Sequence, residues 1–248
     1  MLEKLEAIVM RTKDYGETHK IVTIFSKKRG KLTAIARGAN KPKSKMAAIT
    51  QPFIYGDFLI YINTRGLSTM QQGDVMYSLR KIREDIVKTA YAAYIVELTE
   101  KMLDTLSPNP YIYDQLYFTL KWINNNEDPS IPIMMYELKL YDMGGFAPIV
   151  DRCSACGAKA GSFLFSIREG GLLCTQCCYL DRDAVSLPDT LARLLYIFST
   201  TGLERVGSIN IKEKNKQLLR QLFDAYYDRY GGYYIKSRKF LNQIDLLK

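Results

Sequence analysis

The stretch from Cys153 to Cys177 decides how the C-terminal part of this chain folds; it reads CSACGAKAGSFLFSIREGGLLCTQC. It holds two pairs of cysteines with two residues inside each pair, Cys153 with Cys156 and Cys174 with Cys177. Each short turn directs two thiolates toward one ion, and two such turns complete a tetrahedron. The sequence therefore predicts one zinc ion per chain held by these four cysteines. Four protein ligands leave no position for water, so the site is expected to be structural.

The residues between the two pairs predict a zinc ribbon inserted at 149–182. Gly157 follows the first pair, where a tight turn favours a residue that tolerates positive φ. Residues 162–166 are typical of a short strand, and Gly170 with Gly171 indicates a hairpin turn.

Two other interpretations of the cysteines stay open at this point, namely two disulfides and a redox-active dithiol. We favour a metal because nothing in the chain indicates an oxidising compartment. The fifth cysteine, Cys178, could replace Cys177 as the fourth ligand through a longer spacing, but the shorter spacing favours Cys177.

Length and composition indicate a multidomain protein with real hydrophobic cores. The chain has 248 residues, of which 47% are hydrophobic, a length that fits two or three domains. Glu3 and Glu6 interrupt the beginning of the chain, so no secretory signal is expected, and no apolar run approaches the length of a membrane helix. We therefore expect a soluble, cytoplasmic protein without a membrane partner.

Positive charge is concentrated in the N-terminal part. The net charge is +9, and residues 1–79 hold thirteen basic against six acidic residues. Solubility alone favours mixed signs, whereas residues 18–56 contain no acid at all. Such a block suggests a polyanionic partner, although a solvated basic surface without a ligand is the alternative. The predicted nucleic-acid contacts are Lys20, Lys27, Lys28, Arg29, Lys31, Arg37, Lys41, Lys43 and Lys45.

Residues 1–78 predict a small β-barrel. Five strands are indicated by β-rich runs separated by turn residues, at 6–11, 21–26, 31–37, 53–62 and 67–77. Gly56 is predicted to lie at a β-bulge. Five short strands with tight turns favour an OB-like barrel, and an SH3-like barrel fits nearly as well.

Helical spacing replaces the alternation after residue 78. We expect a helical domain formed by residues 79–148 and 183–248, with the ribbon inserted between these two parts. The fold class is therefore α+β and multidomain. The helices are predicted at 86–103, 111–124, 133–143, 187–201 and 212–230.

The motifs of common enzymes are missing from the sequence. His19 is the single histidine, which excludes a multi-histidine metal site, and we expect it to be a surface or strand-edge residue. The chain lacks a phosphate-binding loop of the GxxxxGK type and the deaminase motif that combines His-x-Glu with Pro-Cys-x-x-Cys. We predict that the protein is not an enzyme. The barrel aromatics are expected mostly in the core, although single ones could stack on bases; they are Tyr15, Phe25, Phe53, Tyr55, Phe58 and Tyr61.

Three stretches of the chain resemble the bacterial recombination mediator family RecO. They are 7–18 leading into 20–23, 30–39, and 145–148 with the four cysteines and the return 165–174. The order of barrel, helices, inserted ribbon and helices extends the likeness over essentially the whole chain.

This resemblance implies a non-enzymatic, nucleoid-associated DNA repair protein. Members of the family bind single- and double-stranded DNA, anneal complementary strands, and act with RecR to help RecA replace the protein SSB on single-stranded DNA. Zinc is expected here because all four cysteines are present. Two other classes stay open: an RNA-binding or transcription-related zinc-ribbon module, and an enzyme such as a nuclease or nucleotidyl transferase.

The resemblance also implies a site for the SSB C-terminal tail, which is acidic and ends in an apolar residue. Such a tail needs an apolar pocket rimmed by cations. Residues 79–83 and the helix after them are one candidate place. We favour the C-terminal run with Arg238, Lys239, Phe240 and Leu241, where cations adjoin apolar side chains; ordinary packing of this run is the alternative.

Overall fold

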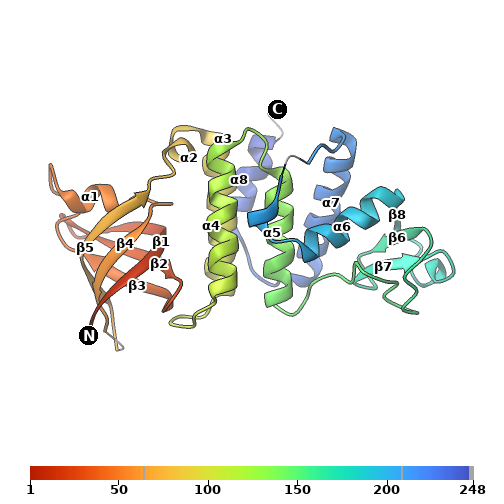
Figure 1. Cartoon of the computed structure of the whole chain (residues 1–248), viewed down its shortest axis with the longest axis horizontal. Coiled ribbons are helices and arrows are strands. Elements are labelled where there is room, and N and C mark those ends of the chain that lie inside the picture. Colours follow the sequence, from red (N-terminus) through yellow and green to blue (C-terminus); the bar gives the residue numbers. More distant parts are fainter. Residues whose placement is uncertain (64, 208, 246–248) are drawn as a thin grey trace. The chain divides into compact units, whose positions relative to one another are not determined.

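The computed structural model of the chain describes residues 1–63, 65–207 and 209–245 (Figure 1). The chain forms two compact units, one of Met1–Pro129 together with the segment from Ile235 onward, and one of Ser130–Tyr234. The elements of the first unit are β1 (Leu2–Tyr15), β2 (His19–Ser26), β3 (Gly30–Ala36), α1 (Lys45–Ile49), β4 (Tyr55–Tyr61), β5 (Ser68–Tyr77), α2 (Arg80–Glu84), α3 (Ile86–Met102), α4 (Pro110–Asn125) and α8 (Lys236–Asp245).

The first five strands close into a barrel in the order β1-β2-β3-β5-β4. All neighbours are antiparallel except β3 and β5, which run parallel because α1 and β4 intervene between them in the chain. This five-stranded Greek-key barrel is of the OB type. The α+β fold class with an OB-like barrel is therefore confirmed.

Alternation of side chains fills the barrel interior. Along β3, every second residue is buried from Gly30 to Ala36, and Leu32 and Ala34 join Val22 and Ile24 of β2 in one apolar cluster. Gly56 lies where the β4–β5 register shifts, so the predicted bulge is confirmed. A Cβ on Gly56 would stand 2.4 Å from the carbonyl oxygen of Asp74, which is why glycine is needed at this close approach.

Helices α3, α4 and α8 accompany the barrel in the first unit. Asp85 caps α3 by accepting the N–H groups of Val87 and Lys88 at 2.8 and 3.0 Å. The sequence prediction did not include α1, α2 or α8. Helices α1 and α2 have only five residues each, too few to show a helical period.

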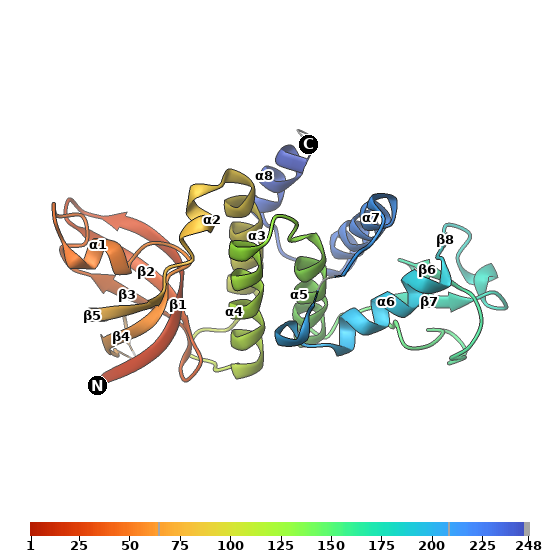
Figure 2. The same cartoon turned by 45° about the horizontal axis from the view of Figure 1, so that its top comes forward.

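The second unit combines helices with a small antiparallel sheet (Figure 2). Strand β6 is central in that sheet, between β7 and β8. The elements are α5 (Ser130–Met143), β6 (Phe163–Ser166), β7 (Gly171–Cys174), η1 (Cys178–Leu180), β8 (Val185–Ser186), α6 (Asp189–Thr200), η2 (Leu203–Arg205) and α7 (Glu213–Tyr230).

Helix α5 is the centre of the second unit, and it is buried on nearly every side. Glu137 of α5 is fully buried and receives two hydrogen bonds from the Arg220 guanidinium of α7, at 2.8 and 3.0 Å. Helix α7 also reaches the ribbon, where the Tyr230 hydroxyl donates to the Ile167 carbonyl at 2.8 Å. These contacts fix the ribbon against the helices of its own unit.

The two units group the helices differently from the predicted domains. Helices α2, α3, α4 and α8 belong to the unit of the barrel, whereas the sequence places them with α5–α7. Contacts alone do not define folding domains, so the limits 1–78, 79–148 with 183–248, and 149–182 stay a prediction. In the described part of the chain, no helix is both long and apolar enough to cross a membrane.

Candidate metal centre and nucleic-acid interface

Four cysteine sulfurs converge in the ribbon. The Sγ atoms of Cys153, Cys156, Cys174 and Cys177 all lie within 4.8 Å of one another, and those of Cys156 and Cys174 are 3.7 Å apart. A tetrahedron with metal–sulfur bonds of about 2.3 Å has edges of about 3.8 Å. The four thiols can therefore hold one metal ion with little movement.

Two similar turns present these sulfurs. Cys153 and Cys156 lie in the loop before β6, where the N–H of Gly157 donates to the Cys153 carbonyl at 2.9 Å. Gly157 has φ +76°, as the sequence predicted. Cys174 ends β7, and the N–H of Cys177 donates to its carbonyl at 3.0 Å. The loop before β6 thus supplies Cys153 and Cys156, and the end of β7 with the turn after it supplies Cys174 and Cys177.

The environment of the sulfurs favours an ionised thiol at Cys153. Burial opposes its ionisation, but backbone N–H groups, those of Cys156 and Cys174 foremost, donate to the sulfur and lower the pKa of Cys153 to about 6. Burial and the neighbouring sulfurs raise the pKa of Cys177 to about 12. A bound cation reverses that second effect, because it stabilises every thiolate around it.

Cys178 lies outside the sulfur cluster. Its thiol donates to the carbonyl of Thr175 at 3.0 Å, and it is half-exposed. All five cysteines, each within the described residues, are free thiols. The arrangement therefore favours a metal ligand set of soft thiolates over the two disulfides considered from the sequence.

The nine predicted nucleic-acid contacts divide between the two ends of the β2–β3 hairpin. In the register of this hairpin Lys20 pairs with Ala36, and Ser26 pairs with Gly30. Six residues of strand separate these pairs, a distance of about 20 Å. The acid-free stretch of sequence is therefore not one continuous face.

The cations at the β2–β3 turn are engaged inside the first unit. Lys27 contacts Asp114 of α4 at 2.8 Å, Lys31 donates to the Glu100 carbonyl of α3 at 2.6 Å, and Arg29 and Lys28 face Glu3. Hydrogen bonding from Arg29 lowers the pKa of Glu3 below its usual range, against the effect of burial. Lys27 and Lys31 therefore link the barrel to the helices of its unit, whereas Lys28 and Arg29 pair with strand β1 inside the barrel.

The other five cations gather at the opposite end of the hairpin. Lys20 is the second residue of β2, Arg37, Lys41 and Lys43 follow β3 in the loop that leads to α1, and Lys45 is the first residue of α1. Within residues 1–63, 65–207 and 209–245, none of these five forms an ion pair. Their charges are available to a polyanion.

Sequence reasoning missed the side chains that organise this end of the barrel. His19, expected as a surface or strand-edge residue, begins strand β2 and is half-buried, and its Nδ1 accepts the N–H of Gly38 at 3.0 Å. Asn40 donates to Asp14 at 2.8 Å. No local pattern could have revealed these bonds, because the partners are 19 and 26 residues apart in the chain.

The barrel aromatics follow the expected division. Phe25, Phe53 and Phe58 are buried, and Tyr55 packs on Tyr117 of α4 with ring centroids 4.5 Å apart. The exceptions are Tyr15 and Tyr61, which are about half exposed. Tyr15 ends β1, at the same end of the hairpin as the five unpaired cations.

The run proposed for an acidic tail forms helix α8. Lys239 and Phe240 are exposed and Arg238 is half-buried, whereas Leu241 is only 4% exposed. Leu241 therefore belongs to the packing of the first unit and not to an open surface. At the other candidate place, Leu79 and Ile82 are buried as well.

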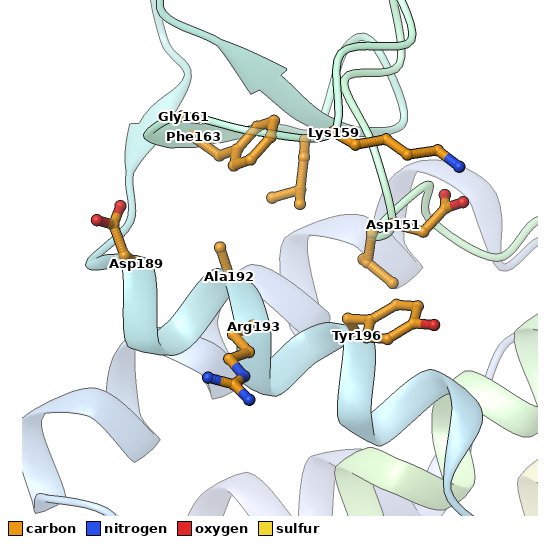
Figure 3. A pocket seen from close by; sticks show the side chains of 10 residues that line it. Asp151, Lys159, Gly161, Phe163, Asp189, Ala192, Arg193 and Tyr196 are labelled. Atoms are coloured by element: carbon orange, nitrogen blue, oxygen red, sulfur yellow. The ribbon is translucent and has the colours of Figure 1, made fainter.

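A cavity of about 350 Å³ lies between the ribbon and α6 (Figure 3). Phe163 and Ala192 face each other across it, whereas Arg193 points away from the ribbon. Its walls are mainly apolar and come from the ribbon and from α6, both in the second unit.

A basic OB-type barrel combined with helices and a four-cysteine ribbon is typical of one class of protein, the proteins that bind nucleic acids. Comparison with known families narrows this class. Residues 1–79 match the family model described as "Recombination protein O N terminal", and residues 83–239 match "Recombination protein O C terminal".

Curated relatives agree over the full length of the chain. The protein is 57% identical over 245 residues to a DNA repair protein RecO from Oceanobacillus iheyensis, covering 99% of this chain and 95% of the relative. It is 46% identical to that of Bacillus pumilus (100% and 96% covered) and 42% identical to that of Bacillus subtilis (100% and 97% covered). The chain belongs to the RecO family of DNA repair proteins.

Proposed function

We propose that this protein is a recombination mediator without enzymatic activity. It binds single- and double-stranded DNA, anneals complementary strands, and, together with RecR, assists RecA loading onto single-stranded DNA coated by SSB, in association with the nucleoid. The main structural support is the group of five unpaired cations at one end of an OB-type barrel. Lysine and arginine there give an affinity that depends on salt and little on sequence.

The test is annealing of complementary oligonucleotides that have been coated with SSB. We expect faster duplex formation with the protein than without it. An unchanged rate would contradict the proposal and favour the RNA-binding alternative. Cleavage or extension of labelled DNA in the presence of Mg²⁺ would favour the enzyme alternative instead.

We further propose that the metal of the ribbon is zinc, one per chain, held by Cys153, Cys156, Cys174 and Cys177. The support is the convergence of four thiols within 4.8 Å. Zinc readily adopts tetrahedral coordination, and four thiolate ligands leave no coordination position open for water. Its contribution is the stability of a sheet too small to hold a core by itself. Elemental analysis of protein purified without added metal checks both identity and stoichiometry.

We also propose that α8 contributes to a site for the SSB C-terminal tail, through Arg238, Lys239 and Phe240, with Leu241 packed behind them. The support is an exposed aromatic ring beside two cations. Fluorescence anisotropy with a labelled tail peptide compares wild type with an Arg238→Ala/Lys239→Ala variant. Weaker binding by the variant is expected, and equal affinities would place the tail elsewhere.

A further inference from the structure

The loop between β3 and α1 carries Arg37, Lys41 and Lys43, three of the five cations that form no ion pair among the described residues, and it is an ordered loop. Two consecutive turns shape it: the N–H of Lys41 donates to Gly38 at 3.1 Å, and the N–H of Ser44 donates to Lys41 at 3.2 Å. Ser44 then caps α1 by accepting the N–H of Met46 at 3.2 Å. Ala39, 1% exposed, anchors the loop in the apolar core of the barrel.

Hydrogen bonds tie this loop to the turn between β1 and β2. The N–H of Asn40 donates to the Thr18 carbonyl at 3.0 Å, and its side-chain amide donates to the Asp14 carboxylate at 2.8 Å. The N–H of Gly38 donates to Nδ1 of His19 at 3.0 Å. Gly38 has φ +71°, so its N–H is aimed at the histidine by a backbone conformation that favours glycine.

The bond to Gly38 defines the state of the imidazole. A backbone N–H can only donate, so Nδ1 has to be the unprotonated nitrogen, and in the neutral ring the proton is on Nε2. The Thr18 hydroxyl, 3.3 Å from Nδ1, lies beside the same atom. His19 therefore serves as an acceptor placed one bond beyond its Cγ atom.

Charges around His19 favour an anionic ligand. Lys20 is adjacent in the chain, and Arg37 and Lys41 flank the docked segment. The carboxylates near this end are Asp14, which is engaged by Asn40, and Glu17 of the β1–β2 turn. Five cations against two carboxylates leave a surplus of positive charge on two neighbouring loops.

We propose that His19 is a positioning residue for nucleic-acid binding: by accepting the Gly38 N–H it fixes the loop of residues 37–44, so that Arg37, Lys41 and Lys43 meet the phosphates of one strand together. A loop that is already ordered does not lose that conformational entropy on binding. The inference rests on the proposed DNA binding and assigns it to this end of the barrel.

The test uses three substitutions of His19 that differ in where they place an acceptor. His19→Asn keeps an oxygen one bond beyond Cγ, in the position of Nδ1. His19→Gln moves the oxygen one atom further out, and His19→Ala removes it. Binding of a labelled single-stranded oligothymidylate is measured by fluorescence anisotropy over a salt series, and thermal unfolding of each variant checks that the barrel is intact.

We expect His19→Gln and His19→Ala to weaken binding by about fivefold, the factor that corresponds to the net contribution of one hydrogen bond. The dependence of affinity on salt should become shallower in both, whereas His19→Asn should bind like wild type. Should a His19 variant unfold early, Asn40→Ala removes the second tie from an exposed loop position and should weaken binding in the same way.

Arg37→Ala/Lys41→Ala is the reference that separates the two levels of the proposal. If it weakens binding while all His19 variants match wild type, His19 has no positioning role, although the barrel still binds DNA. Equal weakening by Asn and Gln at position 19 would likewise overturn the inference. Binding by wild type with no effect of Arg37→Ala/Lys41→Ala would move the DNA site away from this end, and no binding by wild type would end the proposed function itself.

Discussion

At the residue scale, the carboxylate of Glu137 shows that a buried charge needs a hydrogen-bonded partner of opposite charge. It is fully buried in α5, and Arg220 supplies two of its hydrogen bonds. Removing one partner of a buried pair leaves the other without compensation. We expect Arg220→Ala to lower the free energy of unfolding by about 3 kcal/mol, measured by urea denaturation.

Two further variants sharpen this prediction. Arg193→Ala removes an exposed arginine from α6 and should change the stability by less than about 0.5 kcal/mol. A double variant with Leu at positions 137 and 220 should recover much of the loss, because no charge is then buried unpaired. If Arg220→Ala and Arg193→Ala lower the free energy of unfolding equally, the buried Glu137–Arg220 pair contributes no more to stability than an exposed arginine does.

A second prediction at this scale compares two cysteines only 22 residues apart. Cys156→Ser removes one of the four proposed metal ligands, whereas Cys178→Ser changes a thiol that donates to the Thr175 carbonyl. We expect Cys156→Ser to weaken metal affinity by more than about 100-fold, because substitution of residues that only hydrogen-bond to metal ligands already lowers the affinity roughly 10–100-fold. Metal content after dialysis against a chelator measures this. If Cys178→Ser lost the metal and Cys156→Ser retained it, Cys178 and not Cys156 would be the metal ligand.

At the scale of elements, helix α8 depends on a cap that comes from another helix. The Glu97 carboxylate of α3 accepts the backbone N–H groups of Lys236 and Ser237 at 3.0 and 2.8 Å, and the Ser237 hydroxyl at 2.5 Å. A negative charge at a helix N-terminus is favourable. Burial opposes ionisation of Glu97, but the bonds from Ser237 and Lys236 outweigh it and lower its pKa.

The pH dependence of stability follows from this lowered pKa. The contribution of Glu97 is fully present above the ordinary carboxyl pKa of 4.5 and is lost as the pH falls through the lowered value. We expect Glu97→Gln to cost about 1 kcal/mol at neutral pH and to flatten the loss of stability on acidification. Denaturant unfolding over a pH series measures both, with the exposed Glu84→Gln as the control. A parallel pH curve for Glu97→Gln would contradict the assignment.

At the scale of the whole molecule, the barrel divides its cations between two tasks. Those at the β2–β3 turn form contacts inside the first unit, Arg29 with strand β1 and Lys27 and Lys31 with α4 and α3, and those beyond β3 are free of ion pairs among the described residues. Stability and DNA affinity should therefore respond to different substitutions.

Two multiple variants test this division. Arg37→Ala/Lys41→Ala/Lys43→Ala should keep the unfolding temperature and reduce the salt slope of single-strand binding by about 2, since each phosphate contact contributes about 0.7. Lys27→Ala/Arg29→Ala should lower the stability by about 1–3 kcal/mol, because Glu3 loses its main partner, and should keep the salt slope. A reduced slope in the second variant alone would place the DNA at the β2–β3 turn.

Features that depend on spacing within a short segment could be predicted from the amino-acid sequence alone. Two residues between paired cysteines predict a metal-binding turn, the β-rich run at 31–37 beside a turn ending in glycine predicts a strand, found at Gly30–Ala36, and Gly56 indicates a bulge. Long helices with a regular pattern were found to within a few residues. Each of these signals is complete within one short segment of the chain.

Which side chains meet could be learned only from the three-dimensional fold. The charges from Lys20 to Lys45 look alike in the sequence, yet the hairpin carries them to opposite ends, where some find Glu3 or Asp114 and others find solvent. His19 with Gly38, and Glu97 with Ser237, are brought together by strand pairing and helix packing. The physical reason is that hydrogen bonds and ion pairs act over a few ångströms in space, whereas sequence patterns report only neighbours along the chain.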